Sequence, residues 1–286
     1  MPEGYTHVRT AQKAAHAIHY KLQCPAAFAA GANGPDSFFC YEVWKKGQNR
    51  TYNLPLLGNR MHEDKTGAFL LALLHHTHTQ AQIEYTLGFL CHYAADTVMH
   101  PYIVFVSSPG QPYGMKGGHG YFEIALDSTL HAEDPGVSEV PADDSRPVPV
   151  GPALADSFYY TYRLRRLFTS RHGVRRAFYW VLELFFGGRG FITGHVSPAH
   201  LKLNLPEDWT DPATGEERHG GAFALLKDAQ HRCELFMTAA LGHWMGKLDE
   251  EILEKTLGSM SYTTGTETEQ SKSQQAPDAE QAGETA

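Results

Sequence analysis

Apolar residues recur with helical spacing along most of the chain. The run from Gln80 to His100 shows this best, and Pro101 predicts the end of that helix. Further helices are expected at Thr6–Tyr20, Glu63–His76 and about 119–131, 153–169, 172–186, 221–245 and 247–257. Strand-like alternation does not persist anywhere, and no internal repeat is found. The pattern therefore predicts an all-α fold.

The segments between these helices are rich in Gly, Pro and polar residues. They cover about 24–60, 103–118, 132–152 and 187–220, and we interpret them as loops and connectors, with short helical pieces in the first. From Gly258 onwards the composition falls to Ser, Thr, Gln, Glu, Ala and Gly, which cannot bury enough apolar surface to become ordered. We expect one all-α domain over residues 1–257 and a disordered polar tail over 258–286.

Composition and charge narrow the classes of function. The 286 residues are 42% hydrophobic with a formal net charge of −8, which suits a globular protein and argues against broad electrostatic capture of nucleic acid. The four cysteines form no CxxC pair, which is typical of reduced thiols. The first residues carry no apolar signal segment, and the most apolar stretch, Ala177–Ile192, is interrupted by charges and glycines. We expect a cytoplasmic protein.

Histidine is unusually frequent, with 17 residues, and several stand at metal-ligand spacing. His92, Asp96 and His100 are four residues apart, so they point along one face of their helix, and His119 and Glu123 repeat this spacing on the next helix. A single pair of this kind also occurs as a surface hydrogen bond. Five such residues on two mostly apolar, adjacent helices instead favour a metal site, because buried ionisable groups are usually paired or coordinated.

The order of these residues resembles the zinc-dependent phospholipase C family, which shares its fold with the P1/S1-type nucleases. The family presents a His, a loop Asp, a His, the motif HxxxD, another His and the motif HxxxE. The matching positions are His7, Asp36 in NGPDSFF, His62 in MHEDKTG, His92 with Asp96, His100, and His119 with Glu123. The likeness covers about residues 4–130. It implies a multi-helix phospholipase C/P1 nuclease-like bundle with a zinc cluster between its helices.

The resemblance also implies a distribution of ligands. One zinc would be held by Asp36, His62, His92 and Asp96, and a second by His100, His119 and Glu123. His7 and a bridging Asp96 would contribute to a third. Secreted relatives complete that third site with an N-terminal Trp, which this chain lacks. We therefore expect two zinc ions, while the third stays open, with a free Pro2 amine as one hypothesis for its missing ligand.

The resemblance implies a zinc-dependent phosphoric ester hydrolase, a phospholipase C-like phosphodiesterase that uses metal-activated hydroxide. Asp36 would be the catalytic residue that orients or deprotonates the water. The expected partner is a small phosphate ester or a phospholipid head group, with peripheral membrane contact and no obligate nucleic acid. Two alternatives stay open: a P1/S1-like single-strand nuclease, and a non-catalytic metal- and lipid-binding relative. The sequence does not indicate an oligomeric state.

Two further clusters of residues stand outside this pattern. His75, His76 and His78 are interpreted as a polar helix end followed by a turn, with one of them as a spare ligand or a partner of a ligand as the alternative. The Arg-rich stretch 163–176 is interpreted as a solvated helix face, with a patch for phosphate or an anionic membrane as the alternative.

Overall fold

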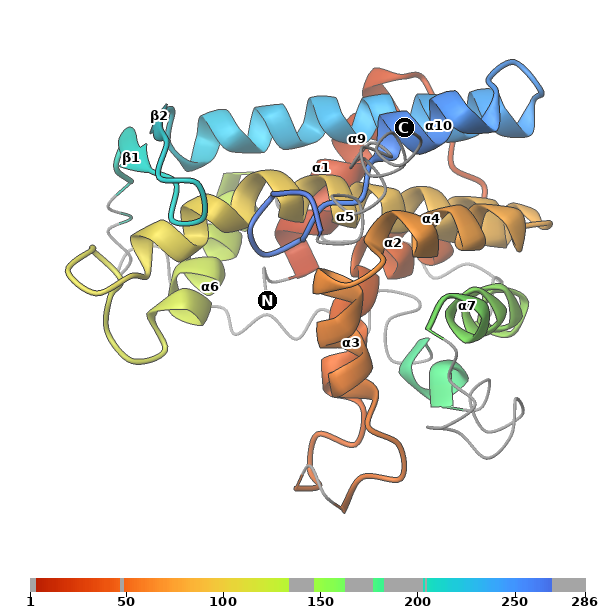
Figure 1. The fold of residues 1–286 in the computed structure, drawn as a ribbon, viewed down its shortest axis with the longest axis horizontal. Coiled ribbons are helices and arrows are strands. Elements are labelled where there is room, and N and C mark those ends of the chain that lie inside the picture. The colour runs from red at the N-terminus through yellow and green to blue at the C-terminus, as the bar shows by residue number, and fades with distance from the viewer. Residues whose placement is uncertain are drawn as a thin grey trace, which may run out of the picture.

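The computed structural model describes residues 4–46, 49–133, 147–162, 177–182, 203 and 205–268. The fold is all-α, as the sequence predicts (Figure 1). The helices are α1 (Gly4–Ala17), α2 (Pro25–Ala32), the 3-10 helix η1 (Gly34–Cys40), α3 (Leu54–Glu63), α4 (Thr66–His75), α5 (Gln80–Val106), α6 (Gly118–Glu133), α7 (Pro147–Tyr162), α9 (Ala222–Trp244) and α10 (Glu250–Leu257). Residues 177–182 are also helical.

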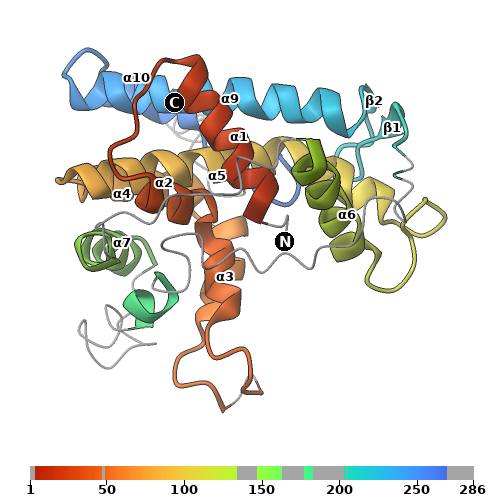
Figure 2. The same cartoon turned by 180° about the vertical axis from the view of Figure 1, so that it is seen from behind.

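Helix α5 is the central element of the fold. Nearly all of its 27 residues are buried, because other helices surround it on all sides. Helix α9 runs alongside α5 in both views, α1 and α2 cross its other side, and α6 lies near its C-terminal end (Figures 1 and 2). A capping box between Thr79 and Gln82 fixes where α5 begins. The face that carries His92, Asp96 and His100 is therefore held in the middle of the molecule.

Helix α5 does not end at Pro101, so this part of the sequence-based prediction is wrong. The helix continues to Val106, and the loop towards α6 begins only at Ser107. A proline inside a helix costs one backbone hydrogen bond and about 3 kcal/mol. Tyr102, Ile103 and Val106 are all buried in the smaller of two hydrophobic clusters, and this burial offsets the local cost.

The helix predicted over Glu63–His76 is two helices. Helix α3 ends at Glu63, and Lys65 adopts a left-handed conformation with φ of 54° before α4 begins at Thr66. The hydroxyl of Tyr162 on α7 donates to the Asp64 carbonyl at 2.7 Å and so holds this turn. The break lets α3 project away from α5 while α4 packs against α7 (Figure 1).

The predicted tail is also wrong in its first part. Residues 258–268 form an ordered turn with a β-bridge between Met260 and Glu267. The Tyr262 backbone N–H donates to the His62 carbonyl at 2.8 Å, and Ser261 and Thr263 donate side-chain hydrogen bonds to Glu63. Hydrogen bonds to α3 therefore order a segment whose own composition is too polar to predict it. Residues 269–286 lie outside the described residues.

Two of the segments predicted as connectors contain regular structure. The segment 187–220 contains a small antiparallel hairpin of β1 (Asp208–Thr210) and β2 (Glu217–His219), and α7 begins at Pro147, inside the predicted connector. Residues 134–146 and the Arg-rich stretch 163–176 lie outside the described residues. None of the helices in the described parts of the chain is long and apolar enough to cross a membrane.

Candidate metal centre

Asp96 stands at the centre of a cluster of histidines on α5. One carboxylate oxygen, Oδ2, lies 3.0 Å from Nε2 of His92, and the other, Oδ1, lies 3.3 Å from Nδ1 of His100. The Asp96 side chain is fully buried. The spacing of four residues thus places all three side chains on one face of the helix.

Three other elements bring further side chains to Asp96. His7 on α1 places Nε2 3.3 Å from Asp96 Oδ1, and His62 on α3 places Nε2 3.8 Å from Asp96 Oδ2. Asp36 on η1 lies beyond them, with Oδ1 3.1 Å from Nε2 of His62 and Oδ2 3.9 Å from Nε2 of His92. Donor atoms of His7, Asp36, His92 and Asp96 all lie within 4.8 Å of one another.

A second group lies on α6 and is joined to the first through His100. His119 Nε2 is 2.9 Å from Oε1 of Glu123, and His100 Nε2 is 3.7 Å from the same oxygen. Donor atoms of His100, His119 and Glu123 also lie within 4.8 Å of one another. The structure therefore brings together all eight residues that the sequence singles out.

Many of the atoms that face one another in this cluster lack a hydrogen-bond partner. They are both ring nitrogens of His7, Oδ2 of Asp36, Nε2 of His92, both oxygens of Asp96 and Nδ1 of His100. Leaving a buried polar group unsatisfied costs about 1–3 kcal/mol each. So many convergent nitrogen and oxygen donors without partners fit bound zinc, whose usual ligands are imidazole nitrogen and carboxylate oxygen.

Backbone carbonyls orient two of the imidazoles. His62 donates from Nδ1 to the Gly58 carbonyl at 2.7 Å, and His92 donates from Nδ1 to the Ala32 carbonyl at 3.1 Å. Each hydrogen bond leaves Nε2 with its lone pair, and in both residues Nε2 is the atom that faces the carboxylates. Metal-binding histidines are commonly fixed in this way.

Glycines allow the backbone to approach His92 closely. A Cβ at Gly34, where φ is +50°, would lie 2.3 Å from the His92 ring. Helices α2 and α5 cross at Gly31 and Gly88, where a Cβ would lie 2.0 Å and 2.2 Å from backbone oxygens of the opposite helix. These contacts place the Ala32 carbonyl against His92 and bring Asp36 to the cluster.

The electrostatics of the cluster favour charged side chains despite their burial. Burial alone would raise the pKa of Asp96, but the surrounding histidines outweigh it and hold this pKa well below its usual value. Burial would likewise lower the pKa of His100, yet Asp96 and Glu123 raise it to about 9. Burial prevails at His7, whose pKa is lowered. In the metal-free cluster, the charged Asp96 carboxylate is therefore paired with the charged imidazole of His100.

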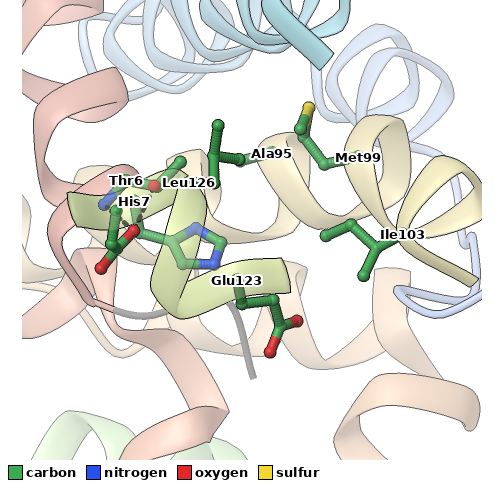
Figure 3. Close-up of a pocket in the computed structure, with 8 residues that line it drawn as sticks. Thr6, His7, Ala95, Met99, Ile103, Glu123 and Leu126 are labelled. Carbon is green, nitrogen blue, oxygen red and sulfur yellow. Dashed lines mark hydrogen bonds between the residues drawn. The ribbon is translucent and has the colours of Figure 1, made fainter. Parts of the chain in front are cut away.

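Solvent reaches the cluster mainly at His119. Its side chain is 37% exposed, against 10% for His62 and Asp36 and 2% or less for His7 and Glu123. A cavity of about 10 Å³ lies on the opposite, inner side, between α1, α5 and α6 (Figure 3). It has room for about one water molecule. His119 is therefore the side chain of the cluster that a molecule from solvent meets first.

Two residues of this region were missed in the sequence. Asp127 follows Glu123 by four residues and accepts hydrogen bonds from the backbone N–H groups of Tyr5 and Thr6 at 3.1 and 3.0 Å, which fixes the start of α1 beside His7. Its spacing from His119 and Glu123 was a usable signal.

Tyr262 packs its ring 5.1 Å from His62 and 5.9 Å from His92, between ring centroids. Nothing in the polar composition of its segment indicated this.

Buried histidines and carboxylates gathered between the helices of an all-α fold have the composition of a metal centre. Residues 6–172 match the family model described as zinc dependent phospholipase C. The match spans more than half of the chain and contains all eight residues of the cluster, so the chain belongs to the zinc-dependent phospholipase C family. Among curated proteins and solved structures, none shows a significant match.

Proposed function

We propose that this chain is a zinc-dependent phosphodiesterase that hydrolyses the phosphate ester of a phospholipid head group. The observation that carries the proposal is the convergence of eight nitrogen- and oxygen-bearing side chains from five elements around Asp96, with buried donor atoms that lack hydrogen-bond partners. Membership in the zinc-dependent phospholipase C family supports the same class of reaction.

In this proposal the eight side chains would hold the ions in groups. Asp36, His62, His92 and Asp96 would hold one zinc, and His100, His119 and Glu123 a second. His7 faces Asp96 from the inner side, where it would contribute to a third. Bound zinc supplies hydroxide at neutral pH by lowering the pKa of a water molecule towards roughly 7, and it neutralises charge on the phosphate.

Asp36 is the residue we assign to handling the attacking water. Burial alone would raise its pKa, but His92 and His62 outweigh burial and hold the pKa below its usual value, so the side chain stays a carboxylate. Its side chain is 10% exposed, whereas that of Asp96 is fully buried, and only one of its oxygens is engaged by His62. The Asp36 carboxylate could therefore orient a water molecule and accept its proton next to the ions.

Exposed apolar side chains on the surface support a lipid substrate and peripheral membrane contact. Val43 and Trp44 are 65% and 67% exposed in the segment between η1 and α3. Met115 and Tyr121 are also exposed, close to His119 in the sequence. Side chains of this kind insert into the boundary between lipid head groups and acyl chains. A protein that reaches lipid from the cytoplasm fits this proposal.

A substrate panel tests the proposal. The purified protein is assayed with phosphatidylcholine vesicles, bis-p-nitrophenyl phosphate and single-stranded DNA, and its zinc is counted by mass spectrometry. We expect zinc-dependent turnover of the first two substrates, which Asp96→Asn abolishes and the exposed Asp228→Asn leaves intact. Turnover of DNA alone would make the protein a nuclease, and zinc without turnover would make it a binding relative. Less than one zinc per chain overturns the proposal.

A further inference from the structure

A second group of metal-ligating side chains lies at the end of the molecule opposite α6. His75 ends α4, His243 lies in the last turn of α9, and Glu250 begins α10, and these three helix ends gather on one side (Figure 1). A donor atom of each residue lies within 4.8 Å of the other two, and His75 Nε2 is 3.3 Å from Oε2 of Glu250. None of these residues belongs to the cluster around Asp96.

Two hydrogen bonds already hold the three helix ends in place. Trp244 donates from Nε1 to the Leu74 carbonyl at 3.3 Å, which joins the ends of α9 and α4 at the residues next to His243 and His75. His243 donates from Nδ1 to the Leu248 carbonyl at 3.1 Å, which holds the turn before α10. The geometry of a site at these residues is therefore built before any ion arrives.

The same hydrogen bond selects the coordinating nitrogen of His243. With Nδ1 donating to Leu248, the ring presents Nε2 with its lone pair, as metal-binding histidines commonly do. His75 and His243 also stand at the C-terminal ends of their helices, where the helix dipole favours a cation. The C-terminal ends of α4 and α9 and the Glu250 carboxylate thus all favour a positive ion at this position.

We propose that His75, His243 and Glu250 form a separate binding site for one Zn²⁺ ion. Two imidazoles and one carboxylate are an established zinc ligand set, with water in the remaining position. Water has access here, because the side chains of His75 and Glu250 are 47% and 56% exposed. The three ligands come from three helices, so the ion joins α4, α9 and α10 as a staple.

An ion held by His75, His243 and Glu250 would act on the Asp96 cluster through the chain segment that follows α10. Helix α10 leads through Gly258 into the ordered turn 258–268, where Tyr262 packs against His62 and His92. An ion at the start of α10 therefore restrains the segment that covers one side of the cluster. The ion is expected to raise the stability of the folded protein, which can be measured without an assay of turnover.

Calorimetric titration of Zn²⁺ into protein whose Asp96 cluster is already loaded tests the site. Wild-type protein should bind one further ion per chain. His75→Ala and Glu250→Gln should weaken this binding by more than about tenfold, because the loss of even an outer partner of a ligand typically costs about 10–100-fold in metal affinity. His78→Ala, an exposed histidine just beyond α4, is the matched control and should bind like wild type. Zinc in the Asp96 cluster, counted separately, should be unchanged in every variant.

Two further measurements distinguish a staple from adventitious surface binding. Added zinc should raise the melting temperature of loaded wild-type protein and slow amide hydrogen exchange in α10, and it should do neither in His75→Ala. The proposal is overturned if wild type binds no ion beyond those of the cluster. It is equally overturned if His75→Ala and Glu250→Gln bind the further ion as tightly as His78→Ala.

Discussion

The carboxylate of Asp127 on α6 accepts a hydrogen bond from the backbone N–H of Thr6 at 3.0 Å, and so ties together residues 121 positions apart. The same oxygen, Oδ1, also accepts from the Thr6 hydroxyl, and the second oxygen, Oδ2, accepts the N–H of Tyr5 at 3.1 Å. A carboxylate at this place satisfies the N–H groups that the start of α1 leaves without helical partners and complements the helix dipole. The contact fixes His7, which is the next residue along the chain.

Asp127→Asn should therefore weaken both the fold and the metal centre. The amide keeps one acceptor oxygen and places donors against the N–H groups of α1, so we expect a loss of about 1–3 kcal/mol in the free energy of unfolding. Urea denaturation measures this loss, and zinc counting should show a lower content of the ion nearest His7. Asp228→Asn, on the exposed face of α9, controls for the change of charge. Equal stability of the two variants would contradict the role we give Asp127.

Gly34→Ala should displace His92. The added Cβ would lie 2.3 Å from the imidazole ring at a residue whose φ is +50°, so both steric contact and backbone strain oppose it. Gly215→Ala is the matched control, because φ is +74° and nothing lies within 4 Å of the added carbon. The control should lose only about 1 kcal/mol in the free energy of unfolding, because of backbone strain, and keep its zinc. Gly34→Ala should lose more stability and bind zinc more weakly, as judged by titration against a chelator.

Zinc binding should depend on pH through His100. Its pKa is raised to about 9 in the metal-free protein, because Asp96 and Glu123 outweigh the opposing effect of burial. A ligand must lose its proton before it binds zinc, so uptake below pH 9 should release this proton, and the apparent affinity should rise about tenfold per pH unit for each proton released. Calorimetry in two buffers of different ionisation enthalpy counts the protons.

The stability of the metal-free protein should change in the opposite direction. Because the pKa of His100 is higher in the folded chain than the ordinary value of 6.5, its ion pairs contribute fully below pH 6.5 and are lost as the pH rises through 9. Denaturation of the apo-protein across this window should show stability falling with increasing pH. Zinc affinity that does not change with pH would rule out His100 as a ligand.

Tyr262 should stabilise the cluster from outside the ligand set. Its ring is buried and lies 4.9 Å from Tyr93 and 5.1 Å from His62, measured between ring centroids. Tyr262→Ala leaves a cavity there, and we expect a loss of about 3–5 kcal/mol in the free energy of unfolding, together with weaker zinc binding. Tyr262→Phe keeps the ring and should lose much less. Similar losses in the two variants would show that the hydroxyl, and not packing of the ring, is what matters.

The features of the fold and the site that could be predicted from the sequence are those set by the local sequence pattern. The spacing of His92, Asp96 and His100 sets their common face wherever the helix packs, so the prediction and the structure agree there. The end of α5 did not follow from its local signal. Pro101 disfavours continuation, but burial of Tyr102, Ile103 and Val106 against distant parts of the chain decides the outcome.

The residues missed in the sequence act through long-range contacts. Asp127 meets the start of α1, and the turn containing Tyr262 is ordered by hydrogen bonds to His62 and Glu63, about 200 positions earlier. The break between α3 and α4 has a similar origin, because Tyr162 holds the turn through the carbonyl of Asp64. Composition and periodicity describe a segment alone and do not include such partners.

The close crossing of α2 and α5 has a consequence for how this chain can vary over generations. Gly31 and Gly88 bind no ion, yet any side chain at either residue would push the two helices apart and carry the Ala32 carbonyl away from His92. Mutational drift at these two residues is therefore constrained by the chemistry of ligands that they never touch. Selection that preserves the proposed zinc cluster should be visible at Gly31 and Gly88 as strongly as at its histidines.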